Sequence, residues 1–436
     1  MREHTISTTP VAIYIPTYNR AKCLDRTIRS ALAQTHRNIR VYVSDNASSD
    51  NTEEVCRKYT VDARCSYLRL SQNQGALKNF ESFNSCSGEP WMMFLADDDY
   101  IDKDYIEKCL SFALKNDCIR VGGTAVNYVG GIERFRDVPF VLKHDAPLLR
   151  LFCFSSIPNT NAVFYGVHRK TTLALDSRMP SSDVGYSWRQ ISRGKVAVIG
   201  TTHIHRDVTH WLDRSEGALP AVWVKLLVAN GYTEFMIQDY ARRYSILDQV
   251  SMYYEELNGR CEEDELRVFL YLMYCVEWCI RVGNMAVRPR FCDFIRDATR
   301  DATKSGFAGI ERFHKLEEWL RRSNGIYQGQ GAGSTTEVEG VITRRCGSFA
   351  GWAKTWNDLW GSAARVYDKG SQDGGLQAAD IIAAQGILRS SCFGRAQLFQ
   401  ERLAKIPMSR YWYGAKIRSI PLIGHVWARY RASVKR

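Results

Sequence analysis

The chain has 436 residues, of which 45% are hydrophobic and 12% aromatic, a composition that excludes a largely disordered protein and predicts roughly two or three folded domains. The formal net charge of +12 and the isoelectric point near 9.1 favour an anionic partner, such as a nucleotide, a nucleic acid or an anionic membrane surface. No stretch approaches about eighteen uninterrupted apolar residues, so the sequence predicts no membrane-spanning helix.

The thirteen cysteines are scattered along the chain, without a C-x-x-C pair and without a Cys/His cluster at zinc-binding spacing. This pattern argues against a structural zinc site. The N-terminal residues also lack an apolar segment of the signal-peptide type. We therefore expect reduced thiols in a cytoplasmic protein, most of them serving as small core residues.

The first 120 residues alternate between strand and helix patterns. Strands are predicted at Val11–Ile15, Asn38–Ser44 and Tyr67–Leu70, and a fourth at Trp91–Ala96. Helical periods follow the first three strands, at Asp25–Gln34, after Thr52 and from Leu77 to Phe83. This order predicts a parallel, doubly wound α/β sheet, and its polar loops should meet at the carboxyl ends of the strands.

Three consecutive carboxylates, Asp97, Asp98 and Asp99, follow the fourth strand. Like charges this close repel one another and raise one another's pKa unless a cation or hydrogen-bond donors lie among them. Mg²⁺ or Mn²⁺ shared with substrate phosphates would suit these hard oxygen ligands. A solvated acidic turn is the alternative interpretation of this segment alone.

Four motifs together resemble the nucleotide-sugar half of a family 2 glycosyltransferase with the GT-A fold. They are Ile15–Arg20 (IPTYNR), Ser44–Thr52 (SDNASSDNT), Asn73–Gly75 (NQG) and Phe94–Asp99 (FLADDD). The resemblance covers residues 8–215 and implies a Rossmann-like nucleotide half and an acceptor half, which form one doubly wound mixed sheet. It also implies a nucleoside-diphosphate sugar donor, a divalent metal bound by the acidic triplet, and inversion at the anomeric carbon.

The resemblance assigns the donor site to the loops after the strands. Nucleotide contacts are expected from Pro16, Thr17, Tyr18, Asn19, Arg20, Asp45, Asn46, Asn73, Gly75, Asp97 and Asp98. The ring of Tyr18 could stack on the base, which contributes roughly 1–3 kcal/mol without selecting among bases. Asn46 stands where the family has a carboxylate, and an amide both donates and accepts, so uracil, thymine and cytosine all remain open. The metal is expected on Asp99 and Asp97, although the family's spaced acidic pair also fits a frame shifted by one residue.

Residues 121–215 carry the predicted acceptor half. Asp183 precedes an amphipathic helix and a Gly-Lys-Val-Ala-Val-Ile strand, the place of the general base in the resembled family, while Ser182 replaces the acidic residue often found before it. A carboxylate that takes the proton of the attacking hydroxyl typically contributes about 10² to 10⁴ in rate. The alternative for Asp183 is a helix cap.

His203 and His205 alternate, so on a strand both side chains point the same way. His205 is a candidate third metal ligand, and Arg206 beside it a candidate phosphate contact. An imidazole satisfied within the fold is the alternative for both histidines.

The rest of the chain changes to long helical periods. The expected divisions are residues 1–120 (nucleotide half), 121–215 (acceptor half), 216–324 (helical accessory domain), 325–340 (linker) and 341–436 (helical region with a basic, aromatic-rich tail). Residues 401–436 hold nine Lys and Arg residues against one acidic residue, interleaved with aromatic side chains. Such a segment suits an anionic bilayer surface, and a basic helix packed on the protein is the alternative.

The sequence thus predicts a metal-dependent, inverting glycosyltransferase of polysaccharide biosynthesis. It would use a UDP, dTDP or CDP sugar and a saccharide or lipid-linked saccharide acceptor, in the cytoplasm or on the inner face of the cell membrane. The alternatives are a nucleotidyltransferase on a similar sheet, for which the Pro16–Arg20 loop is a poor phosphate loop, and a non-catalytic nucleic-acid binder, which the acids at the crevice disfavour. A retaining mechanism would follow only if no carboxylate faced the sugar.

Overall fold

The computed structural model describes residues 6–83, 88–156 except 138, 144 and 146, 161–170, 182–208, and 221–322 except 264–265, 268, 271–272, 275–276, 278–288 and 290. The chain divides into two compact units. The first comprises residues 1–150, 158–177 and 181–210, and the second comprises the remaining residues. The predicted linker at 325–340 and the basic tail at 401–436 lie outside the described residues.

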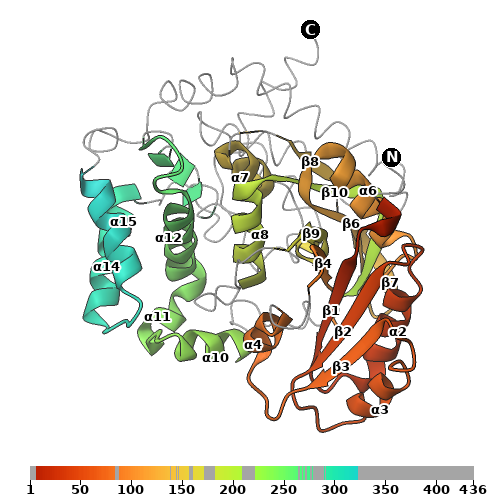
Figure 1. Cartoon of the computed structure of the whole chain (residues 1–436). Helices are drawn as coiled ribbons and strands as arrows, with labels where there is room; N and C mark the ends of the chain where they lie inside the picture. Colours follow the sequence, from red (N-terminus) through yellow and green to blue (C-terminus); the bar gives the residue numbers. More distant parts are fainter. Residues whose placement is uncertain are drawn as a thin grey trace. The chain divides into compact units, whose positions relative to one another are not determined.

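A ten-stranded mixed sheet forms the centre of the first unit (Figure 1). Its main strand order is β3-β2-β1-β4-β9-β6-β10-β5, while β7 pairs with β6 and β8 with β10. The strands are β1 (Val11–Thr17), β2 (Ile39–Asp45), β3 (Cys65–Arg69), β4 (Trp91–Phe94), β5 (Tyr100–Ile101), β6 (Cys118–Val129), β7 (Ile132–Arg136), β8 (Phe140–Leu142), β9 (Val167–Arg169) and β10 (Lys195–Asp207).

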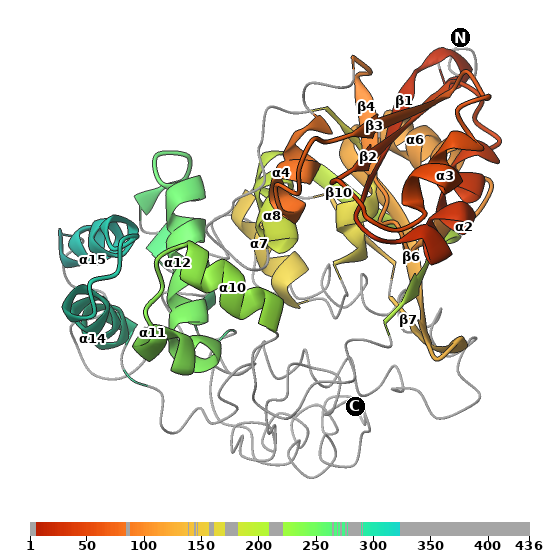
Figure 2. The ribbon, with the colours of Figure 1, turned by 90° about the horizontal axis from the view of Figure 1, so that it is seen from below.

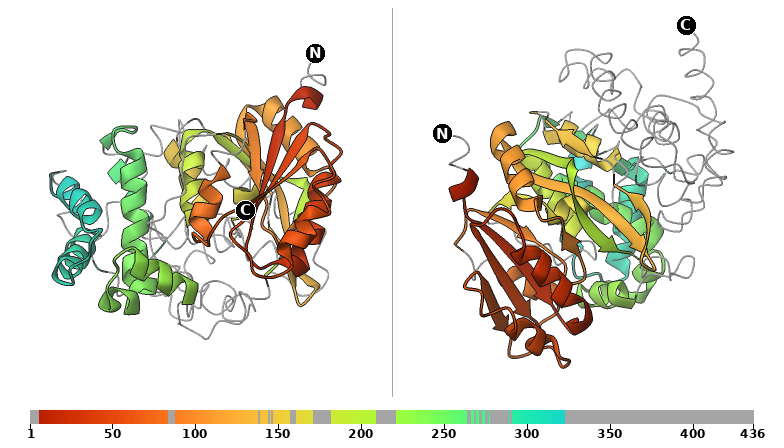
Figure 3. Two further views of the ribbon diagram at one scale, coloured as in Figure 1. Left: turned by 60° about the horizontal axis from the view of Figure 1, so that its bottom comes forward. Right: turned by 90° about the vertical axis from the view of Figure 1, so that its right-hand side faces the viewer.

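The first four strands along the chain are parallel, as the alternation of strand and helix predicted. Figure 3 shows β1, β2 and β3 side by side and twisted relative to one another. In their register Thr17 pairs with Asp45, and Tyr14 pairs with Phe94. The carboxyl ends of β1, β2 and β4 therefore lie at the same edge of the sheet, so the loops that follow them meet there.

Side chains of β1 alternate between two hydrophobic cores, one on each face of the sheet. Val11, Ile13 and Ile15 pack in one core, and Ala12 and Tyr14 pack in the other. Helices α2 (Ala21–Leu32) and α3 (Thr52–Arg57) cover the first face, and α4 (Ala76–Glu81) covers the second (Figures 1 and 2). The remaining elements of this unit are α6 (Tyr105–Asn116), the 3₁₀ helix η1 (Ala162–Tyr165) and α8 (Ser182–Arg193), with α7 (Pro147–Ser156) at the boundary of the units.

The α/β fold class predicted from the sequence is confirmed, and the described part of the C-terminal region is helical. The second unit contains α10 (Ala221–Ala229), α11 (Glu234–Gln238), the π-helix η2 (Tyr240–Tyr244), α12 (Ser245–Leu257), α14 (Phe291–Lys304) and α15 (Glu311–Arg322). Helix α15 packs against both α12 and α14 (Figure 1). No helix within the described ranges combines the length and the apolar character that crossing a bilayer requires.

A buried polar network holds the second unit together. The Asp248 carboxylate on α12 accepts hydrogen bonds from the hydroxyls of Tyr232 and Tyr240 and pairs with the Arg312 guanidinium of α15. Burial raises the pKa of Asp248, and the Arg312 charge and the tyrosine hydroxyls offset only part of that rise. Because a buried carboxylate without these partners would be costly, the network specifies how α12 and α15 pack.

The first unit also buries a cation. Arg120 on β6 is fully buried, and its guanidinium lies over the ring of Tyr186, 5.1 Å from the centroid. Its Nη2 lies 3.1 Å from Nδ1 of His168 on β9, whose Nε2 lies 3.2 Å from the Tyr186 hydroxyl. Burial and the nearby Arg120 charge lower the pKa of His168, so the imidazole is neutral and accepts a hydrogen bond. This chain of contacts ties α8 to the sheet.

Gly123 is required where β10 is irregular. The register between β6 and β10 shifts between Ile199 and His203, and this brings the backbone of Thr202 close to β6. A Cβ on Gly123 would lie 2.5 Å from the Thr202 carbonyl oxygen and 2.7 Å from Cε2 of Tyr105. Backbone atoms cannot give way cheaply, so only glycine fits this position.

We expect Gly123→Ala to lower the free energy of unfolding of this unit by about 1–3 kcal/mol, because the added methyl group overpacks the contact. The matched control is Gly200→Ala on β10, where the nearest atom to a new Cβ is Cγ of Pro139 at 3.5 Å. Urea denaturation followed by circular dichroism would measure both midpoints. Equal midpoints for the two variants would contradict the steric explanation.

Candidate active site

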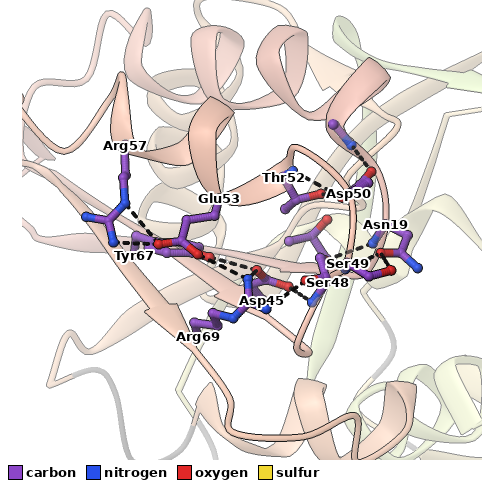
Figure 4. Close-up of polar contacts among 12 residues, drawn as sticks. Asn19, Asp45, Ser48, Ser49, Asp50, Thr52, Glu53, Arg57, Tyr67 and Arg69 are labelled. Atoms are coloured by element: carbon purple, nitrogen blue, oxygen red, sulfur yellow. Dashed lines mark hydrogen bonds and ion pairs between the residues drawn. The ribbon is translucent and has the colours of Figure 1, made fainter.

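The loops after β1 and β2 are fastened to each other by short polar side chains (Figure 4). The backbone amide of Asn19 donates to Oγ of Ser48 at 2.9 Å, and Oδ1 of Asn19 accepts from the amide of Ser49 at 2.8 Å. Asn19 has φ 54°, a left-handed conformation that asparagine tolerates better than most residues. Oδ2 of Asp50 accepts from the amide of Ala21 at 3.1 Å. The Ser-Ser-Asp-Asn-Thr sequence therefore holds the first loop in place.

Asp45 is fully buried at the end of β2, and protein groups already contact both of its carboxylate oxygens. Oδ1 accepts from the amide of Ser48 at 2.8 Å, and Oδ2 accepts from the Tyr67 hydroxyl at 2.7 Å, with Arg69 Nη1 3.6 Å away (Figure 4). In this arrangement Asp45 shapes the loop after β2. Any contact of Asp45 with a nucleotide would share oxygens that are already in use.

Asn46, the residue that departs from the resembled family, links the loop after β2 to the segment before α4. Its Nδ2 donates to Oδ1 of Asn73 at 2.9 Å, and its Oδ1 accepts from the amide of Gln74 at 2.8 Å. Gly75 follows with φ 87°, which a residue with a side chain rarely adopts. The predicted residues Asn46, Asn73 and Gly75 thus lie next to one another.

Pro16 and Thr17 end β1, and Tyr18 follows them with 44% of its surface exposed. The exposed ring of Tyr18 is available for stacking, as the sequence predicted for the base. Burial raises the pKa of Asp97, and the nearby Thr17 hydroxyl and Tyr18 amide oppose part of that rise. The first loop and the acidic triplet are therefore direct neighbours.

The three acids differ in exposure, and Asp99 faces a different arginine from the one that Asp97 and Asp98 share. Arg20 Nε lies 3.7 Å from Oδ1 of Asp97, and Arg20 Nη2 lies 3.7 Å from Oδ2 of Asp98. Arg206 Nε on β10 lies 3.5 Å from Oδ2 of Asp99. The side chains of Asp97 and Asp98 are 14% and 25% exposed, against 5% for Asp99. Asp97 and Asp98 are thus the carboxylates most open to a ligand, and Asp99 faces the interior.

Burial dominates the electrostatics of the triplet. It raises the pKa of Asp97 to about 6, although the Thr17 hydroxyl and the Arg20 charge oppose the rise. It raises the pKa of Asp99 to about 7, where Arg206 opposes the rise and the charges of Asp98 and Asp97 add to it. Carboxyl groups that resist ionisation in this way would gain from a cation, so the donor set fits a divalent metal.

Two residues of α2 fix the backbone of the triplet. The Thr27 hydroxyl lies 2.9 Å from the carbonyl oxygen of Asp97 and 2.7 Å from that of Asp99. Nη2 of Arg26 donates to the carbonyl oxygen of Asp98 at 2.8 Å. The sequence analysis missed both residues. The available signal was a threonine on the apolar face of the helix, which also carries Leu24, Ile28 and Ala31.

Asp183 lies in the first turn of α8, and its Oδ2 accepts a hydrogen bond from Nδ2 of Asn161 at 2.9 Å. Burial lowers the pKa of Arg206, but the nearby carboxylates Asp99, Asp137 and Asp183 outweigh it and leave that pKa raised. Asp99 and Asp183 thus act on the same guanidinium, which also lies 5.1 Å from the centroid of the Tyr165 ring. The predicted base and the acidic triplet belong to one electrostatic cluster.

Both ring nitrogens of His205 already have protein partners. Its Nε2 lies 2.9 Å from Oδ1 of Asp102, its Nδ1 lies 3.1 Å from the Tyr128 hydroxyl, and its ring stacks on Tyr100. His203 contacts the other oxygen of Asp102 at 2.9 Å, so both imidazoles do point the same way. Among the described residues, no group of three or more His, Cys, Asp and Glu side chains forms a metal site. A metal would therefore depend on one or two carboxylates together with phosphate oxygens.

The cysteines that the structure describes as free thiols are Cys23, Cys56, Cys65, Cys109, Cys118, Cys261 and Cys292. Burial raises the pKa of Cys56 to about 12 and that of Cys65 to about 11, so these thiols are poor nucleophiles. Within the described residues, the carboxylates are thus better placed for chemistry than the thiols.

Comparison with known proteins identifies the domain. The sequence model described as Glycosyl transferase family 2 matches residues 12–171. The chain is 29% identical over 110 residues to the putative teichuronic acid biosynthesis glycosyltransferase TuaG of Bacillus subtilis, covering 25% of this chain and 43% of that protein. It is 31% identical over 125 residues to the chondroitin synthase of Pasteurella multocida, and this match covers 28% of this chain and 13% of that protein. The matched segment spans less than half the length of either relative.

Solved structures that resemble this chain include Staphylococcus aureus TarS 1–349 in complex with UDP-GlcNAc. That structure has 15% sequence identity and a TM-score of 0.43, and the match covers 74% of this chain and 95% of that one. Another is the mannosyltransferase PcManGT from Pyrobaculum calidifontis in complex with GDP-Man and Mn²⁺, with 12% identity and a TM-score of 0.38. This match covers 83% of this chain and 89% of that one. Scores this low say nothing about which ligand this chain binds. Residues 12–171 thus match the sequence model of glycosyl transferase family 2, and the relatives of this segment are glycosyltransferases.

Proposed function

We propose that this chain transfers a sugar from a nucleoside-diphosphate sugar of the UDP, dTDP or CDP type to a hydroxyl of a saccharide or lipid-linked saccharide, with inversion. The observation that carries the proposal is the position of Arg206. Asp99 of the triplet lies 3.5 Å from its Nε, and Asp183 acts on the same guanidinium. This supports a single site that takes carboxylates from the donor side and from the acceptor side.

The donor would bind along the loops at the carboxyl ends of β1, β2 and β4. Tyr18 offers an exposed ring for the base, and Arg20, half exposed beside Asp97 and Asp98, offers a cation for the diphosphate. Asp97 and Asp98 would hold Mn²⁺ or Mg²⁺. Asp99 and His205 remain predicted ligands that would have to leave their present partners. When bound, the metal neutralises charge on the departing diphosphate.

The reaction would be one displacement at the anomeric carbon. Asp183 takes the proton of the acceptor hydroxyl, the hydroxyl oxygen forms the new bond to the anomeric carbon, and the bond to the diphosphate oxygen breaks. The nucleoside diphosphate leaves with the electron pair. A base on the acceptor side requires attack from the face opposite the diphosphate, so the configuration inverts.

The acceptor and the location are further parts of the proposal. The names of the relatives, a teichuronic acid biosynthesis glycosyltransferase and a chondroitin synthase, support a polysaccharide acceptor. The basic, aromatic-rich tail at 401–436 would bring the protein from the cytoplasm to the inner face of the cell membrane, next to a lipid-linked acceptor.

A thermal-shift panel of UDP, CDP, dTDP and GDP, each with and without Mn²⁺, tests the donor site. We expect one pyrimidine diphosphate with Mn²⁺ to raise the melting temperature by about 5–10 °C at roughly 100-fold excess over its dissociation constant. Asp97→Asn and Asp98→Asn should remove the shift. Asp117→Asn, at an exposed position directly after α6, should retain it. If none of the nucleotides changed the melting temperature, the donor site would be ruled out.

Replacing Asp183 by asparagine tests the base. The change keeps the shape of the side chain and removes the proton acceptor, so we expect turnover to fall by about 10² to 10⁴ while affinity for the nucleoside diphosphate stays within twofold of the wild type. Radiolabelled sugar transfer and calorimetry would measure the two quantities. Turnover equal to that of Asp117→Asn would exclude Asp183 from the mechanism.

Binding of the metal–nucleotide complex should weaken as the pH falls from 8 to 6. Burial raises the pKa of Asp99 to about 7 and that of Asp97 to about 6, so the carboxylates are ionised above both values and take up protons as the pH falls through them. Calorimetry at pH 8, 7 and 6, corrected for protonation of the free nucleotide, should show a loss of roughly tenfold. Asp183→Asn should show the same pH dependence of binding as the wild type. An affinity independent of pH would contradict the raised pKa values of Asp97 and Asp99.

A further inference from the structure

One amide holds the carboxylate that the proposed reaction uses as its base. Nδ2 of Asn161 donates to Oδ2 of Asp183 at 2.9 Å. Asn161 is 9% exposed and immediately precedes η1, whereas Asp183 lies 22 residues later, in the first turn of α8. The contact therefore joins two separate elements at the acceptor side of the site.

The hydrogen bond controls the orientation of the carboxylate. An amide is neutral, so it fixes one oxygen of Asp183 without cancelling the negative charge that proton transfer requires. With Oδ2 engaged by Asn161, Oδ1 is the oxygen left to face an acceptor hydroxyl. Misplacement of a reacting group by about 1 Å can cost about 10²-fold in rate, so this control matters for turnover.

The short helix η1 extends the contact to the donor side. Asn161 precedes its first residue, and its last residue is Tyr165, whose ring centroid lies 5.1 Å from the Arg206 guanidinium. Arg206 in turn faces Asp99 of the acidic triplet. Phe164, in the same turn, stacks on Phe94 at the end of β4, with ring centroids 5.2 Å apart. One turn of chain thus contacts the base through Asn161 and, through Tyr165, the arginine that faces the acidic triplet.

The backbone at Asn161 limits which residues can stand there. Asn161 has φ 57° and ψ 26°, the left-handed conformation that glycine, asparagine and aspartate adopt at low cost. Aspartate and glycine can therefore replace Asn161 without new backbone strain. This allows the hydrogen bond to be changed while the turn is kept.

We propose that Asn161 is a positioning residue that orients the Asp183 carboxylate for proton abstraction, a role that rests on the proposed function. Asn161→Gly removes the donor and keeps the backbone conformation. Asn161→Asp keeps the size and places a second carboxylate against Asp183. The matched control is Asn116→Asp, the same change on an exposed residue before β6, at the other end of that strand from the site.

Two kinetic results are expected. Asn161→Gly lowers kcat roughly ten- to hundred-fold and leaves KM for the donor within about twofold, because the donor site is untouched. Asn161→Asp moves the acid limb of the kcat/KM profile to higher pH by about one unit or more, because a neighbouring like charge raises the pKa of the base. Asn116→Asp does neither. A wild-type kcat in Asn161→Gly, or an unmoved acid limb in Asn161→Asp, overturns the proposal.

A measurement independent of activity separates this inference from the proposed function. The melting temperature of Asn161→Asp should fall below that of the wild type, because two carboxylates then face each other where an amide faced one, and like charges repel. The exchanged pair Asn161→Asp/Asp183→Asn restores one carboxylate and one amide, so it should recover the melting temperature while transfer stays lost. Failure to recover overturns the contact itself. Full turnover of Asp183→Asn alone would instead refute Asp183 as the base.

Discussion

The structure of the first unit depends on three adjacent carboxylates at the end of β4, of which Asp99 is buried and Asp97 and Asp98 are partly buried. Their mutual repulsion and the loss of water would make this segment unstable if nothing compensated. The compensation comes from two helix residues and two arginines: Thr27 and Arg26 bind the carbonyl oxygens, while Arg20 and Arg206 face the side chains. The compensation is incomplete, since the pKa values of Asp97 and Asp99 stay raised. Because ionising these carboxyl groups remains unfavourable, a bound cation with its diphosphate would stabilise the segment.

Hydrogen bonds also join the loops around the triplet to one another. Their polar side chains accept from backbone amides of neighbouring segments: Oδ1 of Asn19 accepts from the Ser49 amide, and Oδ1 of Asn46 from the Gln74 amide. In such a donor site most side-chain hydrogen bonds hold the loops in their conformation. The Tyr18 ring and Arg20 remain exposed at its surface. Preorganised loops reduce the entropy that a nucleotide must lose on binding. The SDNASSDNT motif is therefore explained mainly as a structural clamp.

The sequence also predicted roles that the structure distributes differently. Asp45 was expected to contact the nucleotide, but both of its oxygens already bind Ser48 and Tyr67. His205 was a candidate metal ligand, and it lies instead between Asp102 and Tyr128. In each case the residue type fits the predicted role, but a neighbour distant in sequence takes up its polar atoms. Neither role has been tested by a bound ligand, and both stay predictions.

The sequence by itself determined the α/β fold class, the parallel order of the first strands and the meeting of three polar loops at one edge. These features follow from local periodicity and from the rule that parallel strands end at the same edge, and both can be read along the chain. Only the tertiary structure decided that Thr27 supports the triplet, that Asp99 faces Arg206 and that Asn161 holds Asp183. The reason is physical: these contacts join residues 22 to 107 positions apart, and their geometry depends on how helices and strands pack, which no local pattern records.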